Sequence, residues 1–333
     1  MEIRDIKLKL FTLKHLTTDE SLFLFEEIMN GKLSEIDISA ILTSLKIKGE
    51  TKEEILGATK IMRSKSHKIL STADTVDTCG TGGDMSNTLN ISTAASLIAA
   101  SCGVKIAKHG NKSVSSKSGS ADMLEHIGYK FSDKKEVLEK ELQNNNFCFM
   151  FAQYHHSAMR HVIKVRKTLG TRTIFNLLGP LTNPANAKNQ LLGVYDKKWL
   201  ETHCRTLKEL GSKNVIIVHG FDGLDEITLT NKTYFYELKD NKITNYIFDP
   251  REIGYDYIAL DDIKGGDPKY NAESFMKMIN GEYKKFQKIV EINAGAALYI
   301  GGKASNIKEG AIIAEKFINE GKTKEYISKV TNE

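Results

Sequence analysis

The 333-residue sequence lacks several features that would indicate a particular class of protein. No stretch approaches the roughly 20 consecutive apolar residues that a membrane-spanning helix needs, so a membrane protein is not expected. Residues 1–16 carry charges throughout and have no apolar centre like that of a secretory signal peptide. The four cysteines are scattered and form no C-x-x-C pair, which argues against a zinc site or a disulfide framework. These absences together predict a cytoplasmic protein.

Arginine is also scarce, since only seven of the 47 basic residues are Arg. The lysines are dispersed among 42 acidic residues and form no long basic block, so a nucleic-acid-binding face is not expected. The net charge of +5 is still compatible with a small phosphorylated substrate. The sequence contains neither the G-x-x-x-x-G-K-[ST] motif of a P-loop nor the G-x-G-x-x-G motif of a dinucleotide-binding fold.

The length and the rhythm of the chain predict two domains. Residues 1–72 contain short amphipathic helices with acidic first turns and clear caps, such as the capping box of Thr51 and Glu54. After them, strands, Gly-rich loops and helices alternate, which predicts a larger α/β domain over residues 73–333. Its sheet is expected to be mostly parallel and covered by helices. Part of 160–190 is expected to join the helical domain.

The first loop whose residues could bind a ligand is 77-DTCGTGGDMSNTLNIST-93, which follows a predicted strand and runs into an Ala-rich helix. The glycines of GTGGD allow positive φ, so that successive N–H groups can turn toward one anion. The residues of NIST begin the helix, where free N–H groups and the helix dipole favour phosphate. For GTGGD alone, a tight turn followed by an ordinary cap is an equally good reading.

A second loop, 108-KHGNKSVSSKSGSAD-122, also lies between a predicted strand and a predicted helix. Lys108 could serve as a point charge and the serine hydroxyls as donors to a phosphate, and Ser120 is expected to cap the helix. A flexible solvated loop would have a similar composition. Two phosphate cradles in one short span predict a substrate that carries two separate phosphate groups.

The third loop, 219-HGFDGLDEIT-228, follows a strongly apolar strand and contains the adjacent carboxylates Asp225 and Glu226. Such a pair is most often an ordinary surface feature. In a parallel sheet, however, ligands bind beyond the carboxyl ends of the strands, where all three loops would meet. Beside phosphates these carboxylates would be suitable Mg2+ ligands, because Mg2+ combines a few carboxylates with substrate oxygens.

The segment between the second and third loops contains three histidines, 155, 156 and 161, and two of the rare arginines. The histidines lack i,i+4 spacing and a nearby carboxylate, so satisfied or solvated side chains are the preferred interpretation. Arg166 and Arg172 are candidates for pairing with a substrate carboxylate, because a guanidinium binds carboxylates bidentately. A role as helix-surface charges fits them equally well.

These segments, together with VRKTLGTRTIFNLLGPLTNP and INAGAALYIGG, occur in an order that resembles the anthranilate phosphoribosyltransferase family along essentially the whole chain. The resemblance implies an α/β fold of the nucleoside phosphorylase/phosphoribosyltransferase type, with a small N-terminal helical domain and a site between the two domains. It implies a homodimer formed through the helical domain, acting on phosphoribosyl pyrophosphate (PRPP) and anthranilate in L-tryptophan biosynthesis. It also implies Mg2+ as cofactor, with two ions per monomer.

The implied reaction gives N-(5-phosphoribosyl)anthranilate and pyrophosphate through an oxocarbenium-like transition state. No residue is expected to act as a general acid or base, and Lys108, Arg166 and Mg2+ would supply positioning and charge stabilisation. The resemblance assigns anthranilate contacts to Gly80, Asn111 and Arg166. It assigns the metal to Ser92, Asp225 and Glu226. The positions that match the family's PRPP contacts are Gly80, Gly83, Asp84, Thr88, Asn90, Ile91, Ser92, Thr93, Lys108, His109, Gly110, Asn111, Lys112, Ser113, Val114, Ser115, Ser116 and Ser120.

The sequence departs from the family pattern at three positions: Lys112 replaces an arginine, and Gln153 and Ser157 replace prolines. Loss of the two prolines is expected to loosen the wall along which anthranilate enters and so to affect substrate affinity. Two other functions remain open at this stage. One is a pyrimidine nucleoside phosphorylase-like enzyme, which would need a base-binding pocket and inorganic phosphate. The other is a nucleic-acid-binding relative without transferase activity, which would need a concentrated basic face.

Overall fold

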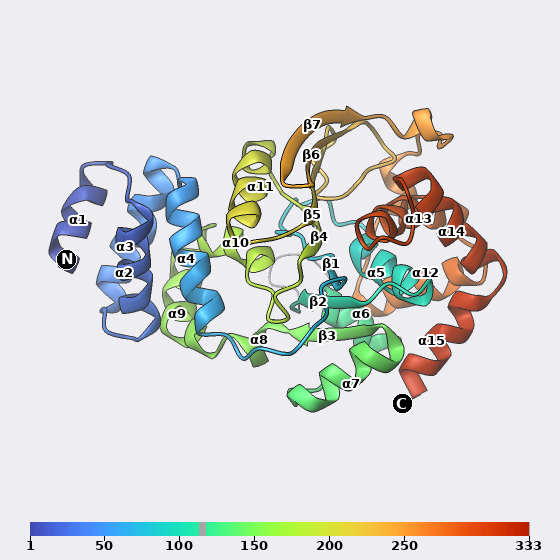
Figure 1. The fold of residues 1–333 in the computed structure, drawn as a ribbon, viewed down its shortest axis with the longest axis horizontal. Helices are drawn as coiled ribbons and strands as arrows, with labels where there is room; N and C mark the ends of the chain where they lie inside the picture. The colour runs from blue at the N-terminus through green and yellow to red at the C-terminus, as the bar shows by residue number, and fades with distance from the viewer. Residues whose placement is uncertain (113–117, 333) are drawn as a thin grey trace. The chain divides into compact units, whose positions relative to one another are not determined.

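The computed structural model of the protein describes residues 1–112 and 118–332. The chain forms two compact units, the first composed of Met1–Lys68 and Gln153–Pro184 and the second of Ile69–Ala152 and Ala185–Glu333 (Figure 1). No helix among the described residues has the length and apolar character needed to cross a membrane.

The first unit is built from helices alone, and capping motifs define where they begin. The side chains of Thr51 and Glu54 form the predicted capping box at the start of one helix, and Thr17 with Glu20 forms another. Buried apolar side chains such as Leu24, Phe25 and Ile38 form its core. The helices are α1 (Ile3–Phe11), α2 (Thr18–Met29), α3 (Glu35–Lys48), α4 (Lys52–Ser64), α9 (Arg160–Leu169) and α10 (Phe175–Leu178), with the short turns α8 (Ala152–His155), η1 (Ser157–Met159) and η2 (Gly179–Leu181).

The second unit contains a seven-stranded sheet in the order β3-β2-β1-β4-β5-β6-β7. Its strands are β1 (Val76–Asp77), β2 (Ile106–Gly110), β3 (Phe147–Phe151), β4 (Asn189–Gly193), β5 (Asn214–Gly220), β6 (Thr233–Lys239) and β7 (Lys242–Phe248). Its helices are α5 (Ile91–Ser101), α6 (Ser120–His126), α7 (Lys135–Asn145), α11 (Leu200–Glu209), α12 (Pro268–Ile279), α13 (Lys284–Ile300), α14 (Ile307–Asn319) and α15 (Lys322–Asn332), with the 3-10 turns η3 (Lys197–Trp199), η4 (Pro250–Ile253) and η5 (Leu260–Ile263).

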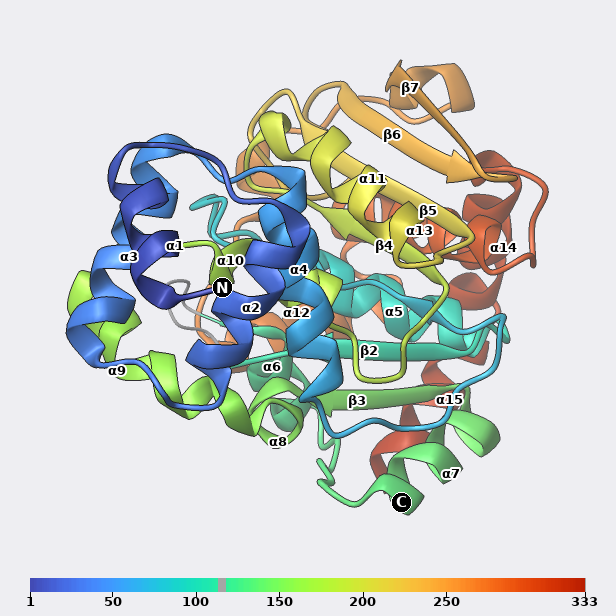
Figure 2. The same cartoon turned by 60° about the vertical axis from the view of Figure 1, so that its left-hand side comes forward.

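The sheet is mostly parallel, as the alternation of strands and helices predicts. Strands β3, β2, β1, β4 and β5 pair in parallel, and β6 and β7 add an antiparallel hairpin at one edge (Figure 2). The hairpin turns at Asp240 and Asn241, both with positive φ, which is the backbone that a two-residue β-turn requires. Because the first five strands run in the same direction, the loops after β1, β2, β4 and β5 leave from one edge.

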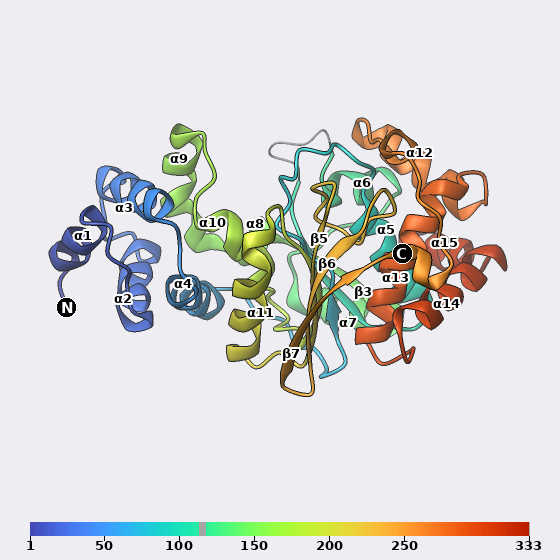
Figure 3. The same cartoon turned by 90° about the horizontal axis from the view of Figure 1, so that it is seen from above.

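Helices cover both faces of this sheet. Helix α11 packs against β5 on one face, and α13 contacts β4 and β5 on the other (Figure 3). The Ala-rich helix α5 lies against α13 and is buried on nearly all sides, which explains its apolar composition. The parallel strands are buried along nearly their whole length because both of their faces are covered. The second unit therefore presents its strand ends from a rigid, densely packed core.

Two local expectations need correction. Ser120 is not the cap of α6: Gly119 occupies that position, and its N–H donates to the carboxylate of Asp122 at 2.8 Å. The side chain of Ser120 is instead engaged with Thr93, so its hydroxyl cannot serve the helix backbone. The strand predicted before the glycine loop is present but only two residues long, because it pairs only at Val76 and Asp77 before the chain leaves the ladder toward the glycines.

Candidate functional site

The glycine loop after β1 is directed at a carboxylate. Gly82 and Gly83 have φ of +63° and +79°, in the region that favours glycine. The N–H of Gly82 donates to Oδ2 of Asp225 at 2.8 Å, and the N–H of Thr81 donates to the carbonyl of Gly193 at 2.9 Å. The loop therefore turns one backbone donor, the N–H of Gly82, toward a negative group, as an anion-binding turn does.

The start of α5 is directed at the neighbouring carboxylate. The N–H of Ser92 donates to Oε1 of Glu226 at 3.1 Å. Asn90 is the N-cap residue, but its side chain does not cap the helix. One of the free N–H groups at this helix start thus binds a carboxylate, which agrees with the preference of helix N-termini for negative charge.

Asp225 and Glu226 both have a raised pKa because they lie in a poorly solvated place beside other carboxylates. Loss of solvation and the nearby carboxylate of Asp84 raise the pKa of Asp225 to about 7. Loss of solvation and the charge of Asp225 raise the pKa of Glu226 to about 8, although the ammonium of Lys108 opposes this rise. Like charges held this close are stable as anions only beside a cation. The strain on these ionised carboxylates would be relieved by a bound metal.

The donor set fits Mg2+. No three Asp, Glu, His or Cys side chains within residues 1–112 and 118–332 converge closely enough to hold a metal by themselves. Mg2+ does not require such a cage, because it usually combines one or two carboxylates with water and substrate phosphate oxygens. Asp225 and Glu226 supply that carboxylate pair, and Ser92 lies within reach of Glu226 through its backbone.

The second loop lies beside the start of α5. The hydroxyl of Thr93 donates to that of Ser120 at 2.9 Å, and the side-chain amide of Asn90 donates to the carbonyl of Ser118 at 3.2 Å. Asn90 also accepts a hydrogen bond from the amide of Asn271 at 2.8 Å. The structure thus brings together hydroxyl and amide groups from the two loops that the sequence analysis assigned to phosphate. Thr88 lies in an isolated bridge with Lys264 near this point.

Lys108 is not exposed to solvent in the structure. Its side chain is 1% exposed, and its ammonium donates to the carbonyl and hydroxyl of Thr78 at 3.0 and 3.1 Å. Burial lowers its pKa, while the surrounding anionic groups oppose that shift. Lys108 therefore lies beneath the glycine loop and close to the carboxylate pair.

Other predicted positions have different surroundings. His109 is buried, and its backbone N–H donates to the carboxylate of Asp77 at 3.2 Å. Asn111 and Lys112 are exposed, and the ammonium of Lys112 binds Glu125 at 2.8 Å. Four predicted PRPP contacts lie outside the described residues, namely Ser113, Val114, Ser115 and Ser116.

Arg166 belongs to the helical unit, where it lies on α9. Its guanidinium carbon is 5.6 Å from the centre of the Phe175 ring, and burial lowers its pKa. The side chain is only partly exposed, so it is more constrained than an ordinary charge on a helix surface. His155, also in this unit, donates from Nδ1 to the carbonyl of His67 at 2.7 Å. Its buried Nε2 has no hydrogen-bond partner among the described residues, so the expectation of a satisfied histidine holds for one ring nitrogen only.

Gly193 is a site residue that the sequence analysis did not single out. A Cβ atom at this position would lie 1.5 Å from the carbonyl oxygen of Asp225, so only glycine allows the backbones to approach this closely. Gly193 ends β4, and β4 lies between β1 and β5 in the sheet. The only signal in the sequence is a glycine at the end of an apolar strand, and its importance depends on strand order.

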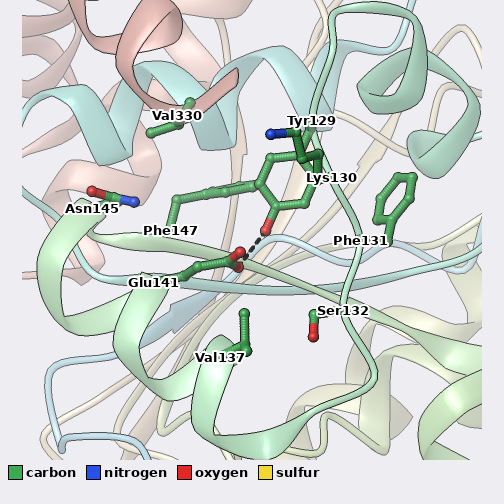
Figure 4. Close-up of a pocket in the computed structure, with 9 residues that line it drawn as sticks. All are labelled: Tyr129, Lys130, Phe131, Ser132, Val137, Glu141, Asn145, Phe147 and Val330. Carbon is green, nitrogen blue, oxygen red and sulfur yellow. Dashed lines mark hydrogen bonds between the residues drawn. The ribbon is translucent and has the colours of Figure 1, made fainter. Parts of the chain in front are cut away.

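A separate cavity of about 250 Å³ lies elsewhere in the second unit (Figure 4). Its wall includes Phe147, the first residue of β3, so the cavity lies at the amino end of that strand and away from the loops described above. The hydroxyl of Tyr129 donates to Glu141 at 2.7 Å inside it. None of the predicted site residues lines this cavity, and we do not associate it with the chemistry.

Comparison with known proteins agrees with this architecture. Residues 4–66 match the family described as "Glycosyl transferase family, helical bundle domain", and residues 72–324 match "Glycosyl transferase family, a/b domain". The chain is 43% identical to anthranilate phosphoribosyltransferase of Methanobrevibacter smithii over 98% of both proteins. It is 46% identical to that of Clostridium beijerinckii, with 96% of this chain and 95% of that protein covered.

Solved structures show the same likeness. The structure is similar to that of anthranilate phosphoribosyltransferase from Thermus thermophilus, with a TM-score of 0.91, 35% identity and 98% of both chains covered. It is also similar to the Saccharomyces cerevisiae enzyme in complex with PRPP and Mg, with a TM-score of 0.88, 27% identity and 99% and 97% of the two chains covered. A further structure of the yeast enzyme, in complex with 4-fluoroanthranilate, has a TM-score of 0.88, 25% identity and covers 99% and 96% of the two chains. The fold, the matched domains and the identity along nearly the whole chain show that the protein belongs to the anthranilate phosphoribosyltransferase family of enzymes.

Proposed function

We propose that the protein transfers the phosphoribosyl group of PRPP to the amine of anthranilate, giving N-(5-phosphoribosyl)anthranilate and pyrophosphate in L-tryptophan biosynthesis. One observation carries the proposal beyond family membership. Asp225 and Glu226 lie against the glycine loop and the start of α5, where they accept hydrogen bonds from the N–H groups of Gly82 and Ser92. A metal-binding carboxylate pair next to two sets of anion-binding backbone donors suits a substrate with a diphosphate.

We propose that the ends of PRPP occupy different parts of this region. The loop from Gly80 to Asp84 and the start of α5 would bind the diphosphate together with Mg2+. The hydroxyl and amide groups around Asn90, Thr93 and Ser120 would bind the 5-phosphate as neutral hydrogen-bond donors. The carboxylates and hydroxyl of Ser92, Asp225 and Glu226 would hold Mg2+, with two ions per chain as the expected number.

The chemistry needs no proton-transfer residue. An arylamine is neutral near pH 7 and can attack C1 of the ribose directly while the bond from C1 to the diphosphate breaks, and the nitrogen then loses a proton to water or to the released pyrophosphate. The transition state is expected to resemble an oxocarbenium ion, as in glycosyl transfer. When bound, Mg2+ neutralises negative charge on the departing diphosphate. The chain would contribute position and electrostatic stabilisation, through the backbone donors of the glycine loop and through the ammonium of Lys108 beneath it.

Arg166 is proposed to pair with the carboxylate of anthranilate, and Gly80 and Asn111 to contact the same substrate. The guanidinium of Arg166 lies against the ring of Phe175 and is partly buried. Little side-chain freedom therefore remains to be lost when a carboxylate binds. A planar guanidinium also forms two parallel hydrogen bonds to a carboxylate, which a lysine cannot do.

The reaction can be tested by following the fluorescence of anthranilate. We expect it to be consumed when PRPP and Mg2+ are both present, and EDTA is expected to stop the reaction. Parallel incubation with thymidine and inorganic phosphate serves as the control for nucleoside phosphorolysis. Release of thymine, with anthranilate unchanged, would replace the proposed function by the phosphorylase.

We also propose that the enzyme forms a homodimer through its helical unit. Large apolar side chains are exposed there: Leu8, Phe11 and Leu13 near the end of α1 are 54–55% exposed, and Ile36 and Ile47 on or beside α3 are 82% and 70% exposed. Exposed apolar side chains on two helices in contact, here α1 and α3, are typical of an interaction surface. Sedimentation equilibrium is expected to give twice the mass of the chain, and substitution of Phe11 by Asp should shift the equilibrium toward monomer. A wild-type monomer would contradict this assignment.

A further inference from the structure

One buried side chain binds the backbone directly after the carboxylate pair. Asn293 on α13 is 0% exposed. Its Oδ1 accepts from the N–H of Ile227 at 3.1 Å, and its Nδ2 donates to the carbonyl of Ile227 at 2.8 Å. Both backbone polar groups of the residue that follows Glu226 are therefore held by one amide.

The side-chain amide of Asn293 suits this position because its oxygen accepts one hydrogen bond and its nitrogen donates two. Besides binding Ile227, Nδ2 donates to the carbonyl of Ile289 at 2.8 Å, one turn earlier in the same helix. An aspartate could accept but not donate, and an apolar residue would leave a buried N–H and a buried C=O without partners. The side chain of Asn293 is thus fixed from both sides rather than free to rotate.

Helix α13 is itself held tightly, so it can serve as a fixed reference. Two residues beyond Asn293, a Cβ at Gly295 would lie 2.5 Å from the backbone nitrogen of Ala311 and 2.8 Å from the carbonyl of Ile307. Helices α13 and α14 therefore touch backbone to backbone at this crossing. We call the pair of hydrogen bonds from Asn293 to Ile227 the clamp. The sequence motif INAGAALYIGG contains both Asn293 and Gly295, the glycine that lets α13 approach α14 closely.

The rest of the loop is ordered by its own polar contacts. Oδ2 of Asp222 accepts from the hydroxyl of Thr228 at 2.6 Å, and Oδ1 accepts from the N–H of Leu224 at 3.1 Å. These bonds shape the turn, but they come from within the same loop. Asn293 ties the turn to helix α13 of the core.

We propose that Asn293 is a positioning residue for the metal-binding carboxylates. By holding the Ile227 peptide, it sets the direction of the preceding backbone, so that Asp225 and Glu226 face Gly82 and Ser92. The role in metal binding rests on the proposed function, because the position of the two carboxylates matters for the metal only if they bind Mg2+. The hydrogen bonds between Asn293 and Ile227 do not depend on the metal and can be tested separately.

The test compares Asn293→Ala with Gln287→Ala. Gln287 lies on the same helix and is 1% exposed, but it donates to Glu291 at 2.8 Å and to Asn319 at 3.2 Å rather than to the carboxylate loop. Both variants remove a buried amide from α13, so both are expected to lower the melting temperature. Only Asn293→Ala should change metal binding. Binding of Mn2+ in place of Mg2+ is measured by electron paramagnetic resonance in the presence of PRPP, without reliance on turnover.

We expect Asn293→Ala to weaken Mn2+ binding and to raise the Mg2+ concentration for half-maximal activity by about 10- to 100-fold, the effect typical of groups that orient metal ligands. The KM for anthranilate should stay near that of the wild type. Gln287→Ala should show wild-type metal binding. Equal metal affinity in the two variants would overturn the proposal.

Hydrogen exchange of the wild-type protein supplies a test that needs no variant. The amide of Ile227 should exchange as slowly as the amides of α13, because its partner is buried in that helix. Exchange of Ile227 at the rate of an exposed loop would refute the clamp. If the wild type shows no Mg2+-dependent transfer, the proposed function fails, whereas slow exchange of Ile227 would still support the clamp.

Discussion

Substitution of Gly193 by alanine should disable the enzyme with a single methyl group. The new Cβ would start 1.5 Å from the carbonyl oxygen of Asp225, whereas side-chain Cβ atoms are essentially never found within 3.0 Å of a neighbour. The backbone at Asp225 must therefore move by about 1.5 Å, the difference between these two distances. The position of the Cβ is fixed by the backbone of residue 193, and the oxygen belongs to the backbone of Asp225, so no side-chain rotation can relieve the overlap.

The displacement should directly reach Asp225 and Glu226, the proposed metal ligands. A misplacement of about 1 Å can cost on the order of 100-fold in rate, so we expect kcat to fall at least that far. Overpacking of a dense region typically costs about 1–3 kcal/mol in the free energy of unfolding, so the protein should remain folded. The loss of activity should therefore be much larger than the loss of stability predicts.

The assay is consumption of anthranilate, followed by fluorescence with PRPP and Mg2+ at saturating concentrations. Gly179→Ala is the matched control, because Gly179 has a φ of −46° and no atom lies within 4 Å of a Cβ built there. That variant should keep wild-type turnover and stability. Turnover of Gly193→Ala close to that of the wild type would show that the position of Asp225 does not control the reaction.

Three further predictions concern charge. The double variant Asp225→Asn with Glu226→Gln should lower kcat by orders of magnitude while circular dichroism stays unchanged; unaltered turnover would remove the metal assignment. Arg166→Ala should mainly raise the apparent KM for anthranilate, and a selective loss of PRPP affinity would show that the residue is misplaced. Because the pKa of Asp225 is raised to about 7 and that of Glu226 to about 8, metal binding must displace protons from them at neutral pH. Affinity for Mn2+, measured by calorimetry, should therefore rise from pH 6 to pH 8 by about tenfold per pH unit for each proton released, and pH-independent affinity would contradict these assignments.

Features that depend on local interactions could be predicted from the sequence. The capping box of Thr51 and Glu54 involves residues three apart, so the pattern contains all of its partners. The mostly parallel sheet could also be predicted, because it depends on the alternation of apolar strands with helices. Ser120 failed as a cap for an equally local reason, since Asp122 reaches back to Gly119.

Features that depend on strand order could not be predicted. The contact of Gly193 with Asp225 exists because β4 lies between β1 and β5, and nothing within β4 itself signals this neighbour. The burial of Lys108 beneath the glycine loop has the same origin, because its partner Thr78 belongs to the adjacent strand exit. The clamp formed by Asn293 joins residues 66 positions apart in the chain. Such contacts follow from packing of the whole unit rather than from a motif.

The most direct test of the account is a crystal structure of this protein with PRPP and Mg2+. We predict metal density bound by Asp225 and Glu226 next to the diphosphate, whose oxygens accept hydrogen bonds from the glycine loop and the start of α5. The 5-phosphate should lie near Asn90, Thr93 and Ser120. A complex in which the two carboxylates point away from the diphosphate, with no metal between them, would contradict the central claim.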